Sequence, residues 1–153
     1  MQSRDYIDSN IIVEILIEGK YKNNCEEYLY SLKAHKTPVG IISFLTLGEI
    51  VKVILEEIED SQKRDFVFGK LLEILKPIDY SGFTEQTLKT ALELIGLDYK
   101  LKNETADAFH LAIAATNGFN RFITLEDKKF GQNLRAYMKT KGTKIVSLAI
   151  DKT

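Results

Sequence analysis

Short apolar runs alternate with longer segments of helical periodicity along the chain. The runs are rich in Val, Ile and Phe and show little alternation between apolar and polar residues. This pattern is typical of strands that are covered on both faces of a parallel sheet. We predict strands at residues 5–8, 39–42, 78–80, 122–125 and 144–148.

Between these runs, apolar residues recur at spacings of three and four, which predicts amphipathic helices. The expected helices cover residues 10–18, 24–35, 43 or 46 to 57, the segment between 64 and 77, 84 or 85 to 95, 105–116 and 131–141. A charged break at 59–64 precedes the fourth helix, Pro77 ends it, and Gly96 ends the fifth. The predicted inner faces of the third and fourth helices consist of Leu47, Ile50, Val51, Ile54 and Leu55, and of Phe66, Leu71, Leu72 and Leu75.

This order of elements predicts an α/β fold, with helices on both faces of a short, mainly parallel sheet. The 153 residues, 44% of them hydrophobic, are enough for one domain with a sizeable core, and we expect a single domain over residues 1–153. No segment approaches the roughly 18 consecutive apolar residues of a membrane span. The first ten residues are too polar for a secretory signal, so we expect a cytoplasmic protein.

The residues that bind soft metals are scarce in this chain. Cys25 is the only cysteine, and His35 and His110 are the only histidines. A multi-thiolate zinc site is therefore excluded. A bound metal would have to be a hard ion held by oxygen, such as Mg²⁺ or Mn²⁺.

Four acidic residues stand where such an ion could bind. Asp8, Glu49 and Asp127 follow the ends of predicted strands, and Asp107 lies in the first turn of the sixth helix. Ligands of open parallel sheets bind beyond the carboxyl ends of the strands. Clustered carboxylates repel each other by several kcal/mol unless a cation neutralises them. A divalent ion there can orient water, lower its pKa and stabilise charge on a phosphodiester during in-line displacement.

Each acid also has a purely structural interpretation. Asp8 could cap the first helix, and Glu49 could form a capping box with Thr46. Asp107 could complement a helix dipole, and Asp127 could cap the last helix. The presence of all four at the expected ligand-binding edge favours a functional cluster.

Other polar residues close to these acids have more ordinary interpretations. His110 follows Asp107 by one helical turn, and a packing or supporting role fits that spacing. Several lysines could border the acids and attract RNA phosphates, although solvated lysines are usual at helix ends. These are Lys128, Lys129, Lys139, Lys141 and Lys144.

The segments around the four acids resemble, in order, the motifs of PIN-domain nucleases of the VapC-like branch. They are YIDSNII from Tyr6, ISFLTLGEI from Ile42, ADAFHLAIAA from Ala106 and FITLEDKKF from Phe122. The last motif departs from the family, which has Thr, any residue and then Asp. Here Asp127 stands one place further from Thr124, although its spacing to Phe130 matches, so Glu126 is an alternative.

The resemblance implies a three-layer α/β/α PIN-like sandwich and a Mg²⁺- or Mn²⁺-dependent endoribonuclease. By resemblance, Asp8 and Asp107 would bind metal directly, while Glu49 and Asp127 would bind through water or a second ion. The residues expected to support them are Ser9, Asn10 and Thr124. The implied partners are an RNA substrate, a second copy in a homodimer and, for a toxin, a small antitoxin.

Two other functions are compatible with the same architecture. A non-catalytic PIN-like module that binds RNA or protein would keep the fold, and the displaced last acid favours it. A phospho-acceptor signalling domain fits less well, because the first strand ends in one Asp rather than an acidic pair. The lack of a glycine-rich turn after that strand argues against a dinucleotide-binding domain.

Overall fold

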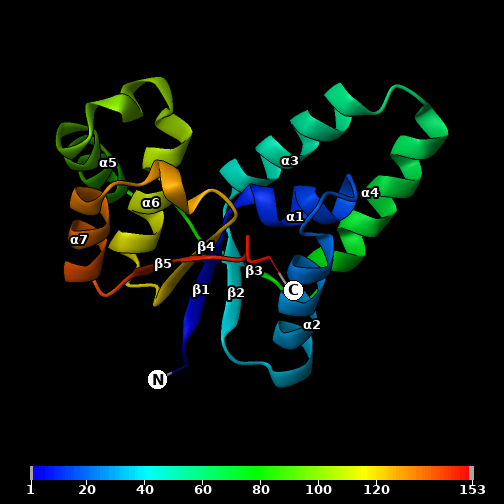
Figure 1. Ribbon diagram of the computed structural model, residues 1–153, viewed down its shortest axis with the longest axis horizontal. Helices are drawn as coiled ribbons and strands as arrows, with labels where there is room; N and C mark the ends of the chain where they lie inside the picture. The colour runs from blue at the N-terminus through cyan, green and yellow to red at the C-terminus, as the bar shows by residue number, and fades with distance from the viewer. Residues whose placement is uncertain (1, 152–153) are drawn as a thin grey trace.

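The computed structural model describes residues 2–151 and contains a five-stranded parallel sheet (Figure 1). The strands lie in the order β3-β2-β1-β4-β5, and all four neighbouring pairs are parallel. They are β1 (Arg4–Ile7), β2 (Val39–Ile42), β3 (Asp79–Tyr80), β4 (Arg121–Thr124) and β5 (Lys144–Ser147). The predicted α/β class is therefore confirmed.

Helices cover both faces of the sheet (Figure 1). One face carries α1 (Ser9–Leu16), α2 (Lys22–His35), α3 (Phe44–Glu57) and α4 (Ser61–Leu75). The other carries α5 (Glu85–Leu97), α6 (Thr105–Thr116) and α7 (Gln132–Thr140), together with the short helix η1 (Tyr99–Asn103). A second short helix, η2 (Asp127–Lys129), follows β4. Within residues 2–151, no helix has the length and hydrophobicity needed to cross a membrane.

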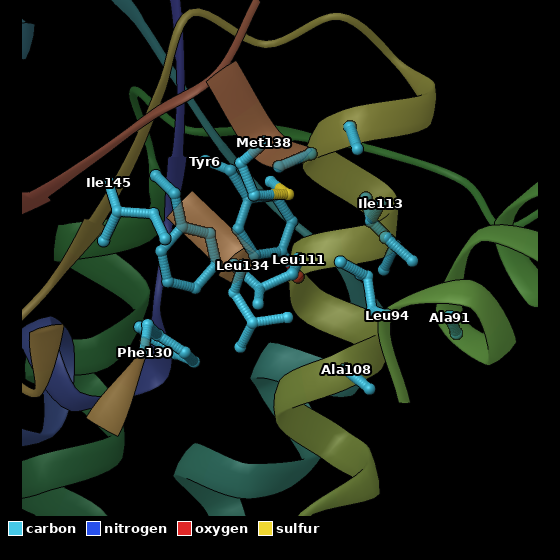
Figure 2. Close-up of a cluster of buried hydrophobic side chains, with 14 of the residues drawn as sticks. Tyr6, Ala91, Leu94, Ala108, Leu111, Ile113, Phe130, Leu134, Met138 and Ile145 are labelled. Carbon is cyan, nitrogen blue, oxygen red and sulfur yellow. The ribbon is translucent and has the colours of Figure 1, made fainter. Parts of the chain in front are cut away.

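Neighbouring residues of β1, β2 and β4 contribute to two different hydrophobic cores. Tyr6 pairs with Phe122, and both pack into the core beneath α5, α6 and α7 (Figure 2). Ile7 pairs with Ile123, and both pack into the core beneath α1 to α4. Both sides of these three strands are buried, which explains why their sequences show little alternation between apolar and polar residues.

The inner faces predicted for two helices are partly wrong. In α4, Phe66 and Leu72 are exposed, whereas Val67 and Leu71 are buried. Leu55 of α3 is also half exposed. Apolar residues occur around much of the circumference of α4, so their spacing alone does not indicate which side packs against the core.

Three predicted boundaries are also corrected. The charged break at 59–64 contains the start of α4, because the Asp60 carboxylate accepts a hydrogen bond from the Gln62 N–H at 2.9 Å and caps the helix. Helix α5 continues past Gly96 to Leu97. The segment between α5 and α6, in which the sequence predicted no helix, includes η1, which Asp98 caps.

The start of α3 corrects the capping box predicted for Thr46 and Glu49. Ser43 is the cap residue, and its hydroxyl accepts a hydrogen bond from the Thr46 N–H at 3.4 Å. The Ser43 N–H donates in turn to the Thr46 hydroxyl at 3.3 Å. Glu49 is therefore not needed for capping and can contact other elements.

The order of the strands places a topological switch point at the carboxyl ends of β1 and β4. The chain passes from β1 to β2 on one side and later returns to β4 on the other. The Asp8 N–H donates to the Ile123 carbonyl at 2.9 Å, so the two strand ends are in direct contact. Crevices at such points are the usual ligand sites of open α/β sheets.

Candidate metal centre

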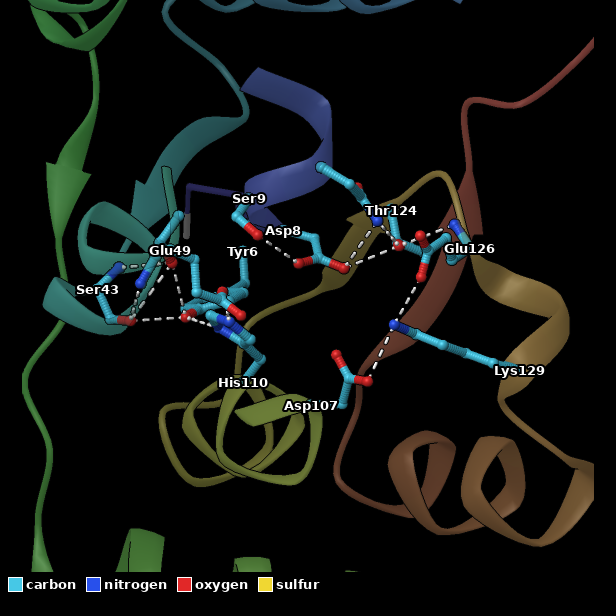
Figure 3. Close-up of polar contacts among 12 residues, drawn as sticks. Tyr6, Asp8, Ser9, Ser43, Glu49, Asp107, His110, Thr124, Glu126 and Lys129 are labelled. Atoms are coloured by element: carbon cyan, nitrogen blue, oxygen red, sulfur yellow. Dashed lines mark hydrogen bonds and ion pairs between the residues drawn. The ribbon is translucent and has the colours of Figure 1, made fainter. Parts of the chain in front are cut away.

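Asp8 lies at this switch point, buried between the end of β1 and the end of β4 (Figure 3). Its carboxylate accepts hydrogen bonds from the Thr124 hydroxyl at 2.9 Å, the Asn10 amide at 3.2 Å and the Ser9 hydroxyl at 3.5 Å. It occupies the cap position of α1 but makes no side-chain capping bond. The capping role considered from the sequence is therefore wrong, and three neutral donors hold the carboxylate in place.

The charge of Asp8 is poorly compensated. Burial raises the pKa of Asp8, and this effect outweighs the opposing influence of His110, Thr124 and Lys129. Among residues 2–151, Asp8 belongs to no ion pair. A bound cation would remove this electrostatic cost.

Glu49 meets His110 where α3 approaches α6. The fully buried His110 places Nε2 2.5 Å from Glu49 Oε1. A carboxylate oxygen accepts hydrogen bonds, so Nε2 carries the proton and donates it. Burial acts to raise the pKa of Glu49, but the interactions with His110, Ser9 and Lys129 together outweigh burial, and the pKa is lowered. Glu49 is therefore held in one orientation as an anion.

Tyr6 connects this pair to the start of α3 (Figure 3). Its hydroxyl oxygen is 2.6 Å from His110 Nδ1, 2.8 Å from Ser43 Oγ and 3.2 Å from Thr46 Oγ1. Burial raises the pKa of Tyr6 further above neutrality, so the phenol keeps its proton. Sequence reasoning missed Tyr6, although it stands two residues before Asp8, which is the spacing of strand residues on one face.

Asp107 lies in the first turn of α6 and shares a cation with Glu126. The Lys129 ammonium is 2.9 Å from Asp107 Oδ2 and 2.8 Å from Glu126 Oε2. Figure 3 shows the lysine side chain reaching between the two acids. The expectation that Lys129 could border the acids agrees with this contact.

Asp127 makes a different ion pair. Its Oδ2 atom is 3.1 Å from Arg135 Nη2 of α7. Helix α7 begins after Gly131, so the capping role considered for Asp127 is wrong. Of the two neighbouring acids, Glu126 is the one whose cationic partner also contacts Asp107.

Three side chains that can bind metals come together at this point. Asp8, Glu49 and His110 each offer a donor atom, and these atoms all lie within 4.8 Å of one another. The proton on His110 Nε2 is directed at Glu49, so the two carboxylates are the available donors. Carboxylates that also leave room for water suit Mg²⁺ and Mn²⁺. The residues present therefore fit a hard divalent ion.

Comparison with known proteins identifies the class of this chain. Residues 6–133 match the model of the PIN domain family, and the chain belongs to that family. This confirms the resemblance found in the sequence motifs.

Several solved structures share the fold. A chain of the VapBC2 complex from Rickettsia felis, bound to a promoter DNA fragment, is 16% identical, with a TM-score of 0.65 and coverage of 94% of this chain and 98% of that one. The FitAcB structure from Neisseria gonorrhoeae is 15% identical, with a TM-score of 0.64 and coverage of 95% and 98%. VapC20 from Mycobacterium tuberculosis, a toxin that cleaves the sarcin-ricin loop, is 15% identical, with a TM-score of 0.58 and coverage of 87% and 94%. No curated protein sequence matches this chain significantly.

Proposed function

We propose that this protein is a Mg²⁺- or Mn²⁺-dependent endoribonuclease that acts as the toxin of a toxin-antitoxin pair. The observation that carries the proposal is the buried Asp8 carboxylate, which has only neutral hydrogen-bond donors and lies beside Glu49 at the switch point of a PIN domain. A structural acid in such a place would be expected to have its own counter-ion.

In this proposal Asp8, Glu49 and Asp107 hold the metal. When bound, the ion would lower the pKa of a water molecule and offset negative charge on the phosphodiester. The supporting residues are Ser9, Asn10 and Thr124, which fix the Asp8 carboxylate through their hydrogen bonds. His110 fixes Glu49 in the same way.

The exposure of the acids fits a site that a polymer can approach from one side. Asp8 is almost fully buried, whereas the side chains of Glu49 and Asp107 are 33% and 16% exposed. Asp8 would therefore form the floor of the site. Glu49 and Asp107 would face the substrate and orient the attacking water in line with the leaving oxygen.

The substrate and partners are proposed from the structural neighbours. VapC20 cleaves the sarcin-ricin loop, an RNA, and the VapBC2 structure is a complex bound to promoter DNA. By this likeness of fold we propose that the chain cleaves RNA, forms a homodimer and is held inactive by an antitoxin. A growth arrest on expression that a neighbouring small open reading frame relieves would support the toxin role, and unimpeded growth would contradict it.

Cleavage of a labelled RNA tests the catalytic proposal. Wild type should cut with Mg²⁺ or Mn²⁺ and lose this activity with EDTA, while Asp107→Asn should lose it with metal present. Equal cleavage by wild type and Asp107→Asn, or no cleavage by wild type with either metal, would refute the enzymatic function. The displaced last acid favours the alternative of a non-catalytic binding module, which calorimetry would support by showing no Mn²⁺ binding.

The fourth acid can be assigned with two matched variants. The Glu126 carboxylate lies beside the ammonium that contacts Asp107, whereas Asp127 pairs with Arg135. We therefore propose that Glu126, rather than Asp127, is the fourth acid of the site. Glu126→Gln should reduce cleavage more than Asp127→Asn, and the reverse order would restore Asp127.

A further inference from the structure

The Lys129 ammonium lies between two acids of the cluster, Asp107 and Glu126. It contacts Asp107 Oδ2 at 2.9 Å and Glu126 Oε2 at 2.8 Å, and its side chain is only 25% exposed (Figure 3). The contact with Glu126 joins residues three apart, as many surface pairs do. The contact with Asp107 joins η2 to α6 and brings the charge into the acidic cluster.

The turn that carries Lys129 is fixed on both sides. Phe130, the next residue, is buried in the core beneath α5, α6 and α7. Arg135 donates hydrogen bonds to the Phe130 carbonyl at 3.1 Å and to the Asp127 carbonyl at 2.7 Å. The backbone on either side of Lys129 is thus anchored, which favours one direction for its side chain.

Lys129 keeps its charge in this position. Burial acts to lower the pKa of Lys129, but the hydrogen bonds and charges of Glu126 and Asp107 outweigh burial and raise the pKa. Its charge also acts on Asp8 and Glu49, where it favours the ionised carboxylates and, at Asp8, opposes part of the effect of burial. One lysine therefore influences all four acids of the cluster.

Charge balance shows what the lysine contributes to the cluster. The four carboxylates of Asp8, Glu49, Asp107 and Glu126 carry four negative charges when ionised. Lys129 offsets one of them, between Asp107 and Glu126, and a divalent ion beside Asp8 and Glu49 would offset two more. The lysine contacts only Oδ2 of Asp107, so Oδ1 remains for a metal on the Asp8 side.

We propose that Lys129 is a built-in cation that replaces a second metal ion between Asp107 and Glu126. The site then takes one divalent ion, on the side of Asp8 and Glu49. This inference rests on the proposed metal-dependent function and specifies how the site is charged.

The proposal can be tested without an activity assay by measuring how the full chain binds Mn²⁺. Titration calorimetry measures the affinity and the number of ions bound, and electron paramagnetic resonance measures the free Mn²⁺. Wild type should bind one ion per chain. Lys129→Met, which removes the charge but keeps much of the side-chain volume, should bind two ions or bind the first at least about tenfold more tightly. Lys129→Arg keeps the charge and should bind one ion, and so should Lys128→Met, which alters the exposed neighbouring lysine.

The outcomes separate this inference from the function on which it rests. Two ions on wild type, or the same number and affinity for wild type and Lys129→Met, would overturn the inference while leaving a metal-dependent nuclease intact. No Mn²⁺ binding by wild type or any variant would overturn both. Thermal melts of each variant, followed by circular dichroism, show whether a change in binding comes from misfolding.

Discussion

Strand β1 has a buried aspartate near each end, and the two differ in how their charge is neutralised. Asp5 receives hydrogen bonds from Arg121 Nε at 2.9 Å, Arg121 Nη2 at 2.6 Å and the Tyr28 hydroxyl at 2.7 Å. Asp8 receives hydrogen bonds only from neutral side chains. Both aspartates are nearly inaccessible to solvent.

The difference between Asp5 and Asp8 shows that burial alone does not identify a functional acid. A buried carboxylate that is paired with a bidentate guanidinium needs no bound ligand, because the guanidinium neutralises its charge and donates hydrogen bonds to its oxygens. A buried carboxylate without a counter-ion retains an unfavourable charge that an external cation can relieve. Asp5, at the amino end of β1, therefore has a structural role, and Asp8, at the carboxyl end, is the candidate metal ligand.

The largest expected effect is on activity at the carboxyl end. We expect Asp8→Asn to reduce metal-dependent RNA cleavage by on the order of 1000-fold, because several kcal/mol of metal-derived stabilisation is lost. The matched change Asp5→Asn should leave the rate per folded molecule nearly unchanged. The measurement is the cleavage rate divided by the amount of folded protein. An equal loss of activity in both variants would contradict the distinction between a structural Asp5 and a functional Asp8.

The next largest effect is on stability at the amino end. Arg121→Met leaves Asp5 buried without its counter-ion, and we expect the free energy of unfolding to fall by about 3 kcal/mol. Urea denaturation measures this difference. Lys144→Met, an exposed change at the position paired with Arg121 on β5, should alter stability by less than about 0.5 kcal/mol. Similar losses in the two variants would show that the ion pair contributes little.

Two tyrosine hydroxyls provide a smaller and closely matched test. Tyr6→Phe removes the hydrogen bond to His110 and should weaken Mn²⁺ binding by about 10-fold or more, as changes behind a metal ligand do. Tyr28→Phe removes a hydrogen bond to Asp5 and should cost about 1 to 2 kcal/mol of stability while leaving Mn²⁺ affinity unchanged. Equal Mn²⁺ affinity in the two variants would exclude a positioning role for Tyr6.

The smallest expected effect is the pH dependence of stability. Burial raises the pKa of Asp8 above its unfolded value, so the folded state binds a proton more readily, and stability falls as pH rises between the two values. With EDTA present, Asp8→Asn should therefore be more stable than wild type at pH 7, and this advantage should shrink as pH falls through the raised pKa of folded Asp8 and be lost below the pKa of Asp8 in the unfolded chain. Chemical denaturation of both proteins over this pH range measures the difference in stability. A difference in favour of Asp8→Asn that increased on acidification would contradict the prediction.

The sequence was enough to predict the layers of the fold and the approach of Asp8 to Glu49. Both follow from short-range patterns, because parallel strands end at one edge of a sheet and Glu49 lies in the helix that follows such a strand. The inner face of α4 could not be predicted, since Phe66 and Val67 are both apolar and only packing against the core decides between them.

The partners of the acids were harder to foresee. Tyr6 meets His110 across 104 positions of sequence, and this contact depends on how α6 is placed against β1. Lys129 reaches Asp107 only because η2 turns the chain back after β4. Such contacts arise from tertiary packing, and no local spacing in a single sequence encodes them.

The alternation of β1 has a consequence for how the chain tolerates insertions. Asp5 and Ile7 point to the face of α1 to α4, Tyr6 points to the face of α6, and Asp8 follows directly after the strand. Adding one residue between Asp5 and Tyr6 would reverse the facing of one part of the strand relative to the other, so the Asp5 ion pair and the Tyr6 contact with His110 would not both be retained. Viable length variation should therefore fall outside residues 4–8, and this segment can serve as a fixed reference when more divergent sequences are aligned.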